Sequence, residues 1–337
     1  MTTETSVSLA PRSDETALET TLDYSVIIDR FLEAHDIKPK SKETYRRALR
    51  QFFTYLQDNG ITKPTRETLI AYKAYLIDKQ LSAYTVSAYI IAVRKMFQWT
   101  ESEHLYANIA SQIKGQKKPK GFKKDALSVK QAQKLLTDME TDTLSGARDY
   151  ALVNSLVRTG LRTIEAVRAD IEDIRRQGEQ AVLFIQGKGR DSKDDIVILT
   201  EETLEPIRAY ISMRGQGVKD SSPLFISHSD RNYGQRLTTR SVSRIVKDKL
   251  QVSGLDDKRL TAHSLRHTAV TFSLIGGASI QEAQTLARHS DINTTLIYAH
   301  NLDRIAKAPE LKIDALLGDT RNVNNVYNVN TKSEATV

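Results

Sequence analysis

The chain contains no cysteine among its 337 residues, and it has no long hydrophobic run. The lack of thiols excludes disulfide bridges, thiolate metal sites and cysteine nucleophiles, and it agrees with a protein of the reducing cytoplasm. No apolar segment approaches the length of a membrane span, and no signal peptide opens the chain. We therefore expect a cytoplasmic protein without a membrane segment.

The charge of the chain is unevenly distributed. With 39% apolar and 27% charged residues the composition is that of an ordinary globular protein, long enough for two domains, and the net charge is +7. Residues 1–20 carry a net charge of −3, residues 21–124 carry +9, and the remainder carries +1. A positive field confined to the first folded segment and the stretch after it suggests a polyanionic partner.

Apolar spacing and turn residues predict two domains. Residues 1–20 and 319–337 lack a periodic pattern, so we expect a disordered leader and a disordered tail. Helical spacing within 21–110 predicts a small all-α domain with helices at 22–35, 41–60, 65–79 and 82–100, with Ser41 as a cap. Residues 111–124, SQIKGQKKPKGFKK, combine six lysines with two glycines and a proline, which predicts a basic linker.

The second predicted domain, 125–318, is mainly α-helical with a small β-sheet. A helical pattern runs from 128 to 159 and stops at Gly160. Two apolar strands at 182–185 and 196–199 flank a Gly-Lys-Gly turn and predict a hairpin. Further helices are expected at 201–213, 239–250, 264–275, 279–288, 292–299 and 309–317.

Basic residues of the first domain recur at spacings that could form one positive face. They are Lys42, Arg46, Arg47, Arg50, Arg94 and Lys95, and Lys117 and Lys118 follow in the linker. Contact with DNA phosphates is one interpretation, and a solvated helix surface is the other. Composition does not choose between them.

Residues suited to phosphate chemistry occur in four separate segments. Arg162 follows a glycine at a helix start, where free backbone amides also favour an anion, and Lys188 lies in the hairpin turn. His263 and Arg266 are three residues apart and share a helix face, while His289 precedes Tyr298 by nine residues. Each residue alone has a structural explanation. Together they could converge on one phosphodiester.

The ordered set resembles the tyrosine recombinase (phage integrase) family. Gly-Leu-Arg-x-x-Glu, Gly-Lys-Gly, His-x-Leu-Arg-His and a histidine nine residues before Tyr-x-His follow the family pattern over about 125–317, and 22–102 resembles its SAM-like core-binding domain. In outline the chain is similar to Xer-type and simple integrases. The family usually has Leu-Gly-His where this chain has Ala287-Arg288-His289, and Arg288 would be a phosphate contact or a solvated side chain.

The resemblance implies a catalytic set and a role for each member. The set is Arg162, Lys188, His263, Arg266, His289 and Tyr298, with Glu165 and His267 in support. Tyr298 would attack the scissile phosphate, the two arginines would bind its oxygens, and Lys188 would protonate the leaving oxygen. His263 would take the proton of Tyr298, and His289 would bind a non-bridging oxygen. No metal or other cofactor is expected.

The expected function is therefore site-specific recombination of duplex DNA through a 3′-phosphotyrosine, for integration or excision of a mobile element or resolution of DNA dimers. The expected assembly is a homodimer on each site and a tetramer in synapsis, and an accessory directionality factor is a further candidate partner. Two alternatives stay open at this point: a type IB topoisomerase, and a DNA-binding protein without catalysis.

Overall fold

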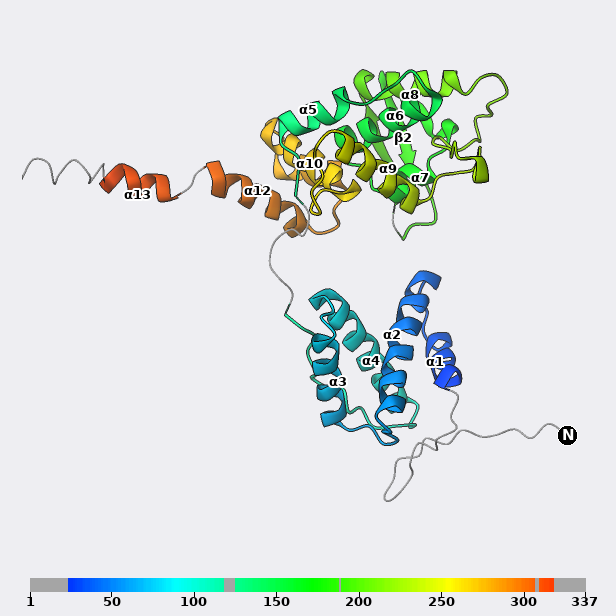
Figure 1. The fold of residues 1–337 in the computed structure, drawn as a ribbon, viewed down its shortest axis with the longest axis vertical. Coiled ribbons are helices and arrows are strands. Elements are labelled where there is room, and N and C mark those ends of the chain that lie inside the picture. Colours follow the sequence, from blue (N-terminus) through cyan, green and yellow to red (C-terminus); the bar gives the residue numbers. More distant parts are fainter. Residues whose placement is uncertain (1–23, 118–124, 188, 307–308, 318–337) are drawn as a thin grey trace, which may run out of the picture. The chain divides into compact units, whose positions relative to one another are not determined.

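The computed structural model describes residues 24–117, 125–187, 189–306 and 309–317. The chain divides into two compact units, residues 1–120 and 121–337 (Figure 1). The division falls within the stretch predicted as a linker, of which 118–124 lie outside the described residues. The predicted leader, 1–20, and tail, 319–337, lie outside them as well. Within the described ranges, no helix is both long and apolar enough to cross a membrane.

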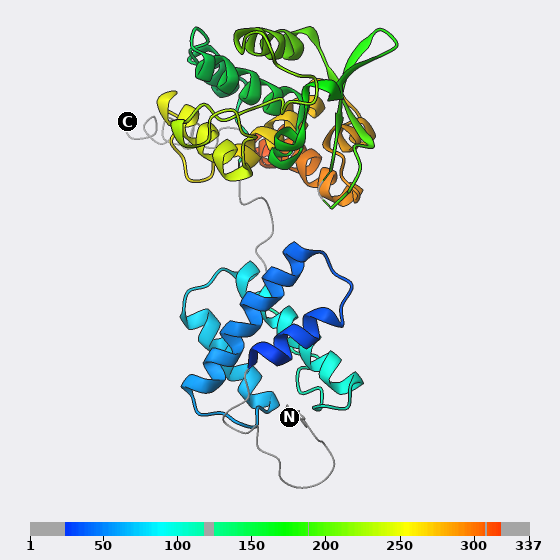
Figure 2. The ribbon, with the colours of Figure 1, turned by 90° about the vertical axis from the view of Figure 1, so that its right-hand side faces the viewer.

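The described residues of the first unit form four helices, drawn in blue and cyan in Figure 2. They are α1 (Tyr24–Glu33), α2 (Pro39–Asp58), α3 (Arg66–Asp78) and α4 (Ala83–Ser102). Helix α2 begins at Pro39 rather than after Ser41, because the proline ring fixes a helical φ and the first turn needs no N–H at that position. Thr65 and Ser82 cap α3 and α4 with side-chain hydrogen bonds to backbone N–H groups three residues on.

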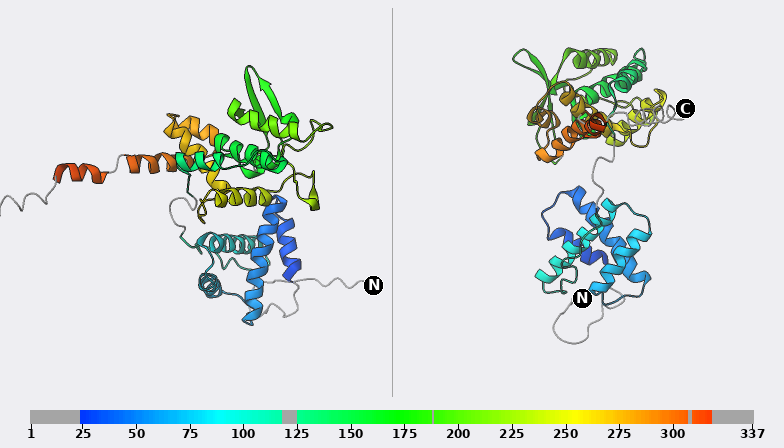
Figure 3. Two further views of the ribbon diagram at one scale, coloured as in Figure 1. Left: turned by 45° about the horizontal axis from the view of Figure 1, so that its top comes forward. Right: turned by 90° about the vertical axis from the view of Figure 1, so that its left-hand side faces the viewer.

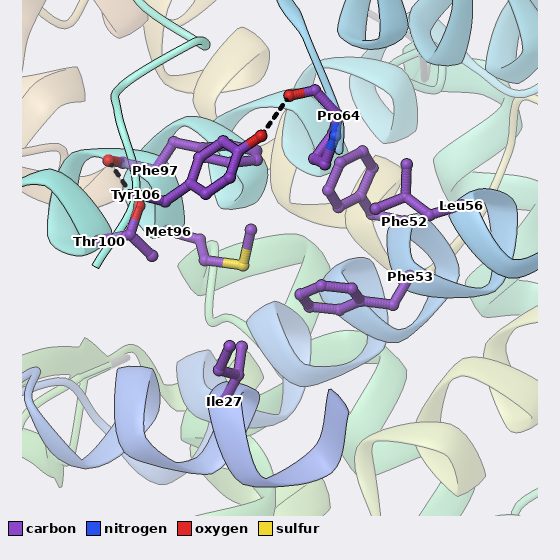
Figure 4. Close-up of a pocket in the computed structure, with 9 residues that line it drawn as sticks. All are labelled: Ile27, Phe52, Phe53, Leu56, Pro64, Met96, Phe97, Thr100 and Tyr106. Atoms are coloured by element: carbon purple, nitrogen blue, oxygen red, sulfur yellow. Dashed lines mark hydrogen bonds between the residues drawn. The ribbon is translucent and has the colours of Figure 1, made fainter. Parts of the chain in front are cut away.

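Aromatic rings fill the centre of the first unit. The ring of Phe52 lies 5.0 Å from that of Tyr72 and 6.0 Å from that of Phe97, measured between centroids. The hollow beside them, shown in Figure 4, has a volume of about 30 Å³, and the Tyr106 hydroxyl closes one side by donating to the carbonyl of Pro64 (2.8 Å). This space admits about one water molecule, so it is a gap in the core rather than a ligand site.

The first part of the predicted linker packs onto this unit instead of acting as a spacer. Ile113 is only 6% exposed and belongs to the core of the unit. Lys73 donates to the carbonyl of Lys114 (2.8 Å), and Ser87 donates to that of Gln116 (3.0 Å). The buried isoleucine and these side-chain hydrogen bonds to the backbone attach residues 111–117 to the first unit.

The second unit is mainly helical with one small sheet, as the sequence predicts. Its helices are α5 (Val129–Thr137), α6 (Leu144–Thr159), α7 (Thr163–Arg168), α8 (Glu201–Met213), α9 (Thr239–Val252), α10 (Ala262–Ile275), α11 (Ile280–Ala287), α12 (Ile292–Ala306) and α13 (Pro309–Leu317). The helical pattern expected over 128–159 is broken between α5 and α6, because Thr143 caps a new helix through the N–H of Gly146. Helix α12 continues to Ala306, beyond the expected end at 299.

The sheet has three antiparallel strands in the order β1 (Ile174–Gln177), β2 (Gln180–Ile185) and β3 (Asp195–Leu199). Strands β2 and β3 are the predicted hairpin, with Val182 opposite Ile198. Strand β1 was not predicted, because Ile-Arg-Arg-Gln offers one apolar side chain; its charges suit an exposed edge. Figure 2 shows the sheet (green) at one edge of the unit.

Helix α6 runs through the core of the second unit. It packs against α8 and α10, and Leu152, Leu156 and Leu265 are completely buried there. Helix α10 in turn contacts α11 and α12 (Figure 3). The end of α6, the first turns of α10 and the connection between α11 and α12 are thereby brought to one place, and most of the predicted catalytic residues lie there.

Candidate active site

Arg162 stands where α6 is followed by α7. Gly160 ends α6 in a left-handed conformation (φ +62°), and a Cβ at this position would lie 3.2 Å from Leu286. Glu165 accepts two hydrogen bonds from Arg162, one from its backbone N–H and one from its guanidinium, both 2.7 Å long. Another guanidinium N–H of Arg162 donates to the carbonyl of Arg288 (3.0 Å). These bonds orient Arg162 before any ligand arrives.

Arg266 reaches the same corner from α10 and is 2% exposed. Its two terminal nitrogens donate to the carbonyl oxygens of Gly160 and Ala287. Burial, and then the positive charges of Arg162 and Arg288, lower the pKa of Arg266 to about 9. A guanidinium carries five N–H donors, so Arg162 and Arg266 each keep donors for a further acceptor.

An open hollow of about 370 Å³ adjoins these two arginines. It is lined by Leu161, Arg162, Thr163, Ile164, Ser243, Thr261, Ala262, His263 and Arg266. This lining contains no carboxylate, so it presents positive charge and N–H donors to an anion. Burial, followed by the charges of Arg266 and Arg162, lowers the pKa of His263, which leaves a neutral imidazole at pH 7 that can accept a proton.

Tyr298 lies on α12, outside the lining of that hollow, and is 5% exposed. Its hydroxyl shares a hydrogen bond with Nδ1 of His267 on α10. Burial raises the pKa of Tyr298 to about 12, and burial, followed by the nearby His263 and Arg266, lowers the pKa of His267 to about 4. The family resemblance implied that His263 takes the proton of the phenol and that His267 has a supporting role, whereas in the structure the phenol bonds to His267.

The spacing of the two histidines explains why the sequence alone could not place His267 rather than His263 beside the phenol. His263 and His267 are four residues apart on α10, so both lie on the same helix face. Their ring centroids are 4.5 Å apart. Which imidazole meets the phenol depends on where α12 packs along α10, and that packing is a tertiary property.

His289 lies beside the tyrosine. Its ring centroid is 6.3 Å from that of Tyr298, with an angle of 23° between the planes, and its Nδ1 shares a hydrogen bond of 3.0 Å with the Thr295 hydroxyl. Burial, and then Arg266, lower the pKa of His289 to about 4. Thr295 is fully buried and was not selected from the sequence, although it lies six residues after His289 on the following helix.

Arg288, which the sequence left open as a phosphate contact or a solvated side chain, is buried and paired with protein groups. Its side chain is 8% exposed and does not line the hollow. It donates to the Glu165 carboxylate (2.9 Å) and to the carbonyls of Gly160 (3.0 Å) and Leu286 (2.7 Å). Burial would raise the pKa of Glu165, but Arg288 and Arg162 outweigh it and hold that pKa below its ordinary value.

Lys188 lies outside the described residues, between β2 and β3. Two other cations of the same turn are held by carboxylates. Lys193 pairs with Asp170 (2.7 Å) and with Asp173 (2.5 Å), and Arg190 pairs with the carboxylate of Asp194 at 2.9 Å. Among the described residues, no group of three or more histidines and carboxylates could hold a metal ion.

The cations predicted to contact DNA lie on two helices of the first unit that pack together. Helix α2 carries Lys42, Arg46, Arg47 and Arg50, and α4 carries Arg94 and Lys95. Four of them, Arg47, Arg50, Arg94 and Lys95, are exposed and are called the basic residues of α2 and α4 below. Lys42 is partly buried, and Arg46 pairs with Asp29 at 2.6 Å. Lys117 is exposed, and Lys118 lies outside the described residues.

Both units of this chain match families of known proteins in sequence. The profile of the phage integrase family matches residues 125–304, and that of the phage integrase N-terminal SAM-like domain matches residues 28–104. The tyrosine recombinase XerD of Listeria monocytogenes is 30% identical over 286 residues, which cover 82% of this chain and 91% of the relative. The tyrosine recombinase XerC of Herpetosiphon aurantiacus is 28% identical over 271 residues, covering 78% of this chain and 85% of the relative.

Solved structures show the same fold at lower identity. The XerH site-specific recombinase bound to its palindromic difH substrate aligns with a TM-score of 0.67 at 23% identity, covering 85% of this chain and 84% of that one. A lambda integrase dimer bound to a COC′ core site aligns with a TM-score of 0.63 at 17% identity, covering 80% and 96%. Because the family profile spans more than half of the chain and XerD is similar over most of both lengths, the chain belongs to the phage integrase family and is a tyrosine recombinase, an enzyme that exchanges DNA strands.

Proposed function

We propose that the protein binds duplex DNA at a specific site and that Tyr298 attacks the scissile phosphate there. The hollow beside Arg162 and Arg266 carries this proposal, because two oriented guanidinium groups with spare N–H donors suit the non-bridging oxygens of a phosphodiester. The same donors stabilise the additional negative charge of the pentacoordinate transition state. The phenol oxygen bonds to phosphorus as the 5′-oxygen leaves, and the resulting 3′-phosphotyrosine keeps the bond energy for religation.

The proton transfers follow from the position of each group. Tyr298 must leave His267 to reach a phosphate in the hollow, and there the neutral His263 accepts the phenol proton. His289 donates to a non-bridging oxygen. Lys188 gives a proton to the departing 5′-oxygen; that Arg190 and Lys193 are engaged by aspartates supports this choice. The reaction serves integration and excision or the resolution of DNA dimers.

The nucleophile is tested with Tyr298→Phe and a suicide substrate nicked near the cleavage point. Wild-type protein should be trapped on a 3′ DNA end, whereas Tyr298→Phe should bind the same DNA with equal affinity and form no adduct, because only the attacking oxygen is missing. Tyr233→Phe removes an exposed hydroxyl (63% exposed) and should react like wild type. An adduct recovered from Tyr298→Phe would refute the assignment.

We further propose a dimer on each DNA site and a tetramer at synapsis, with α13 of one subunit docked on another. In α13, Ile313, Leu316 and Leu317 are 54%, 88% and 66% exposed. A helix of nine residues is not stable alone in water, so its apolar side chains need a cover.

Truncation after Asp303 should leave binding to one half-site intact and reduce cooperative binding to a full site in a gel-shift titration. Leu316→Ser with Leu317→Ser should give the same loss at full chain length. Unchanged cooperativity in both variants would mean that α13 docks within its own chain.

A further inference from the structure

Arg288 occupies a backbone position that suits glycine. It follows α11 with a φ of +50°, in the left-handed region that is unfavourable for residues with a Cβ. The family pattern usually has glycine here, so the arginine brings strain that a glycine would avoid. The interactions of its guanidinium must therefore offset the free-energy cost of this strained backbone conformation.

What the guanidinium contributes is a positive charge beside Glu165. Glu165 is fully buried and pairs with both Arg162 (2.7 Å) and Arg288 (2.9 Å). With Arg162 alone, the carboxylate would form a pair of zero formal charge. With Arg288 added, the three groups carry +1, and Arg266 raises the formal charge of the site to +2. A phosphodiester carries one negative charge, and its pentacoordinate transition state carries two.

Arg288 exerts this effect without reaching the ligand. The side chain of Arg288 is 8% exposed, against 28% for that of Arg162. Of these two arginines, Arg162 lines the hollow and Arg288 does not. The backbone carbonyl of Arg288 also accepts a hydrogen bond from the Arg162 guanidinium (3.0 Å). One residue thus neutralises the carboxylate that would otherwise compete for Arg162, and it helps to orient Arg162 as well.

We propose that Arg288 is a positioning residue that serves as the counter-ion of Glu165 and leaves the charge of Arg162 available to the scissile phosphate. This role rests on the proposed function of the hollow. Arg288 also links the connection that precedes the nucleophile helix α12 to the arginine at the start of α7, across 126 positions of the sequence.

The first measurement is the single-turnover rate of covalent adduct formation on a suicide substrate at saturating protein. Arg288→Gly should lower this rate roughly 10- to 100-fold, below the loss expected for a direct oxyanion donor. Glycine relaxes the left-handed backbone, so we expect the variant to fold and to bind DNA within about twofold of wild type. Arg288→Lys should recover part of the rate. Arg208→Ala on α8, an arginine 55% exposed, is the surface control and should match wild type.

Two further comparisons separate charge from simple packing. A methylphosphonate at the scissile position removes the phosphate charge, so wild type and Arg288→Gly should cleave it at rates within about threefold. Glu165→Gln combined with Arg288→Gly restores the formal charge of +2 and should be faster than Arg288→Gly alone. An equal defect on both substrates, or a double variant slower than Arg288→Gly, would overturn the proposal. Absence of any adduct from wild type would overturn the proposed function itself.

Discussion

Replacing His267 with leucine should loosen the segment that carries the nucleophile. The Tyr298 hydroxyl is buried and shares a hydrogen bond with His267 Nδ1, and leucine cannot replace that bond. Removing a hydrogen-bond partner from a buried hydroxyl costs about 1–3 kcal/mol. Because 1.4 kcal/mol corresponds to about a tenfold change in an equilibrium, the local opening of α12 should become roughly 5- to 150-fold more frequent.

Hydrogen–deuterium exchange of the DNA-free protein measures this opening. Peptides covering α12 should lose protection by the stated factor, while peptides from α9 should keep theirs. His228→Leu is a matched control, because His228 shares a hydrogen bond with another buried tyrosine, Tyr210 (3.1 Å), in a different part of the unit. That variant should leave the exchange of α12 unchanged.

The rate of covalent adduct formation by the same variant decides which of the two histidines accepts the proton of Tyr298. If His263 accepts the proton of Tyr298, His267→Leu should form the covalent adduct at least as fast as wild type, because Tyr298 leaves His267 more easily. A loss of more than about tenfold would show that His267 takes part in the proton transfer. Unchanged exchange in α12, or loss of protection throughout the second unit, would refute the view that this bond holds the helix locally.

Stability and DNA binding provide two more predictions. The pKa values of His267 and His289 are lowered to about 4 from an ordinary value of 6.5, so the unfolded chain binds more protons than the folded one between these pH values. The free energy of unfolding should therefore fall as the pH is lowered through this window, and a melting temperature that does not change between pH 7 and pH 4.5 would contradict these values. Replacing the four basic residues of α2 and α4 with alanine should reduce the slope of log K against log salt by up to about 3.6, at about 0.9 per phosphate contact. An unchanged slope in the alanine variant would mean that these residues do not face DNA.

Short-range patterns were sufficient to predict much of this protein. The spacing from His263 to Arg266 and the nine residues from His289 to Tyr298 are short-range patterns that carry the resemblance to the tyrosine recombinase family, and that resemblance implied the chemistry. Two apolar runs on either side of a Gly-Lys-Gly turn predict the hairpin of β2 and β3, and most helix limits follow from caps. Strand β1 escaped prediction because its Arg175 and Arg176 give no apolar pattern, and their extended conformation depends on pairing with β2.

The tertiary structure decided which distant groups meet. Arg288 and Glu165 are 123 residues apart, Arg266 and Gly160 are 106 apart, and Tyr298 and His267 are 31 apart. Sequence spacing constrains geometry only within one helix or turn. Contacts between elements depend on how α6, α10 and α12 pack, and this packing is set by the shape of the whole core. It selects His267 as the partner of the phenol, and it makes Arg288, which the sequence left open as a phosphate contact or a solvated side chain, the buried partner of Glu165.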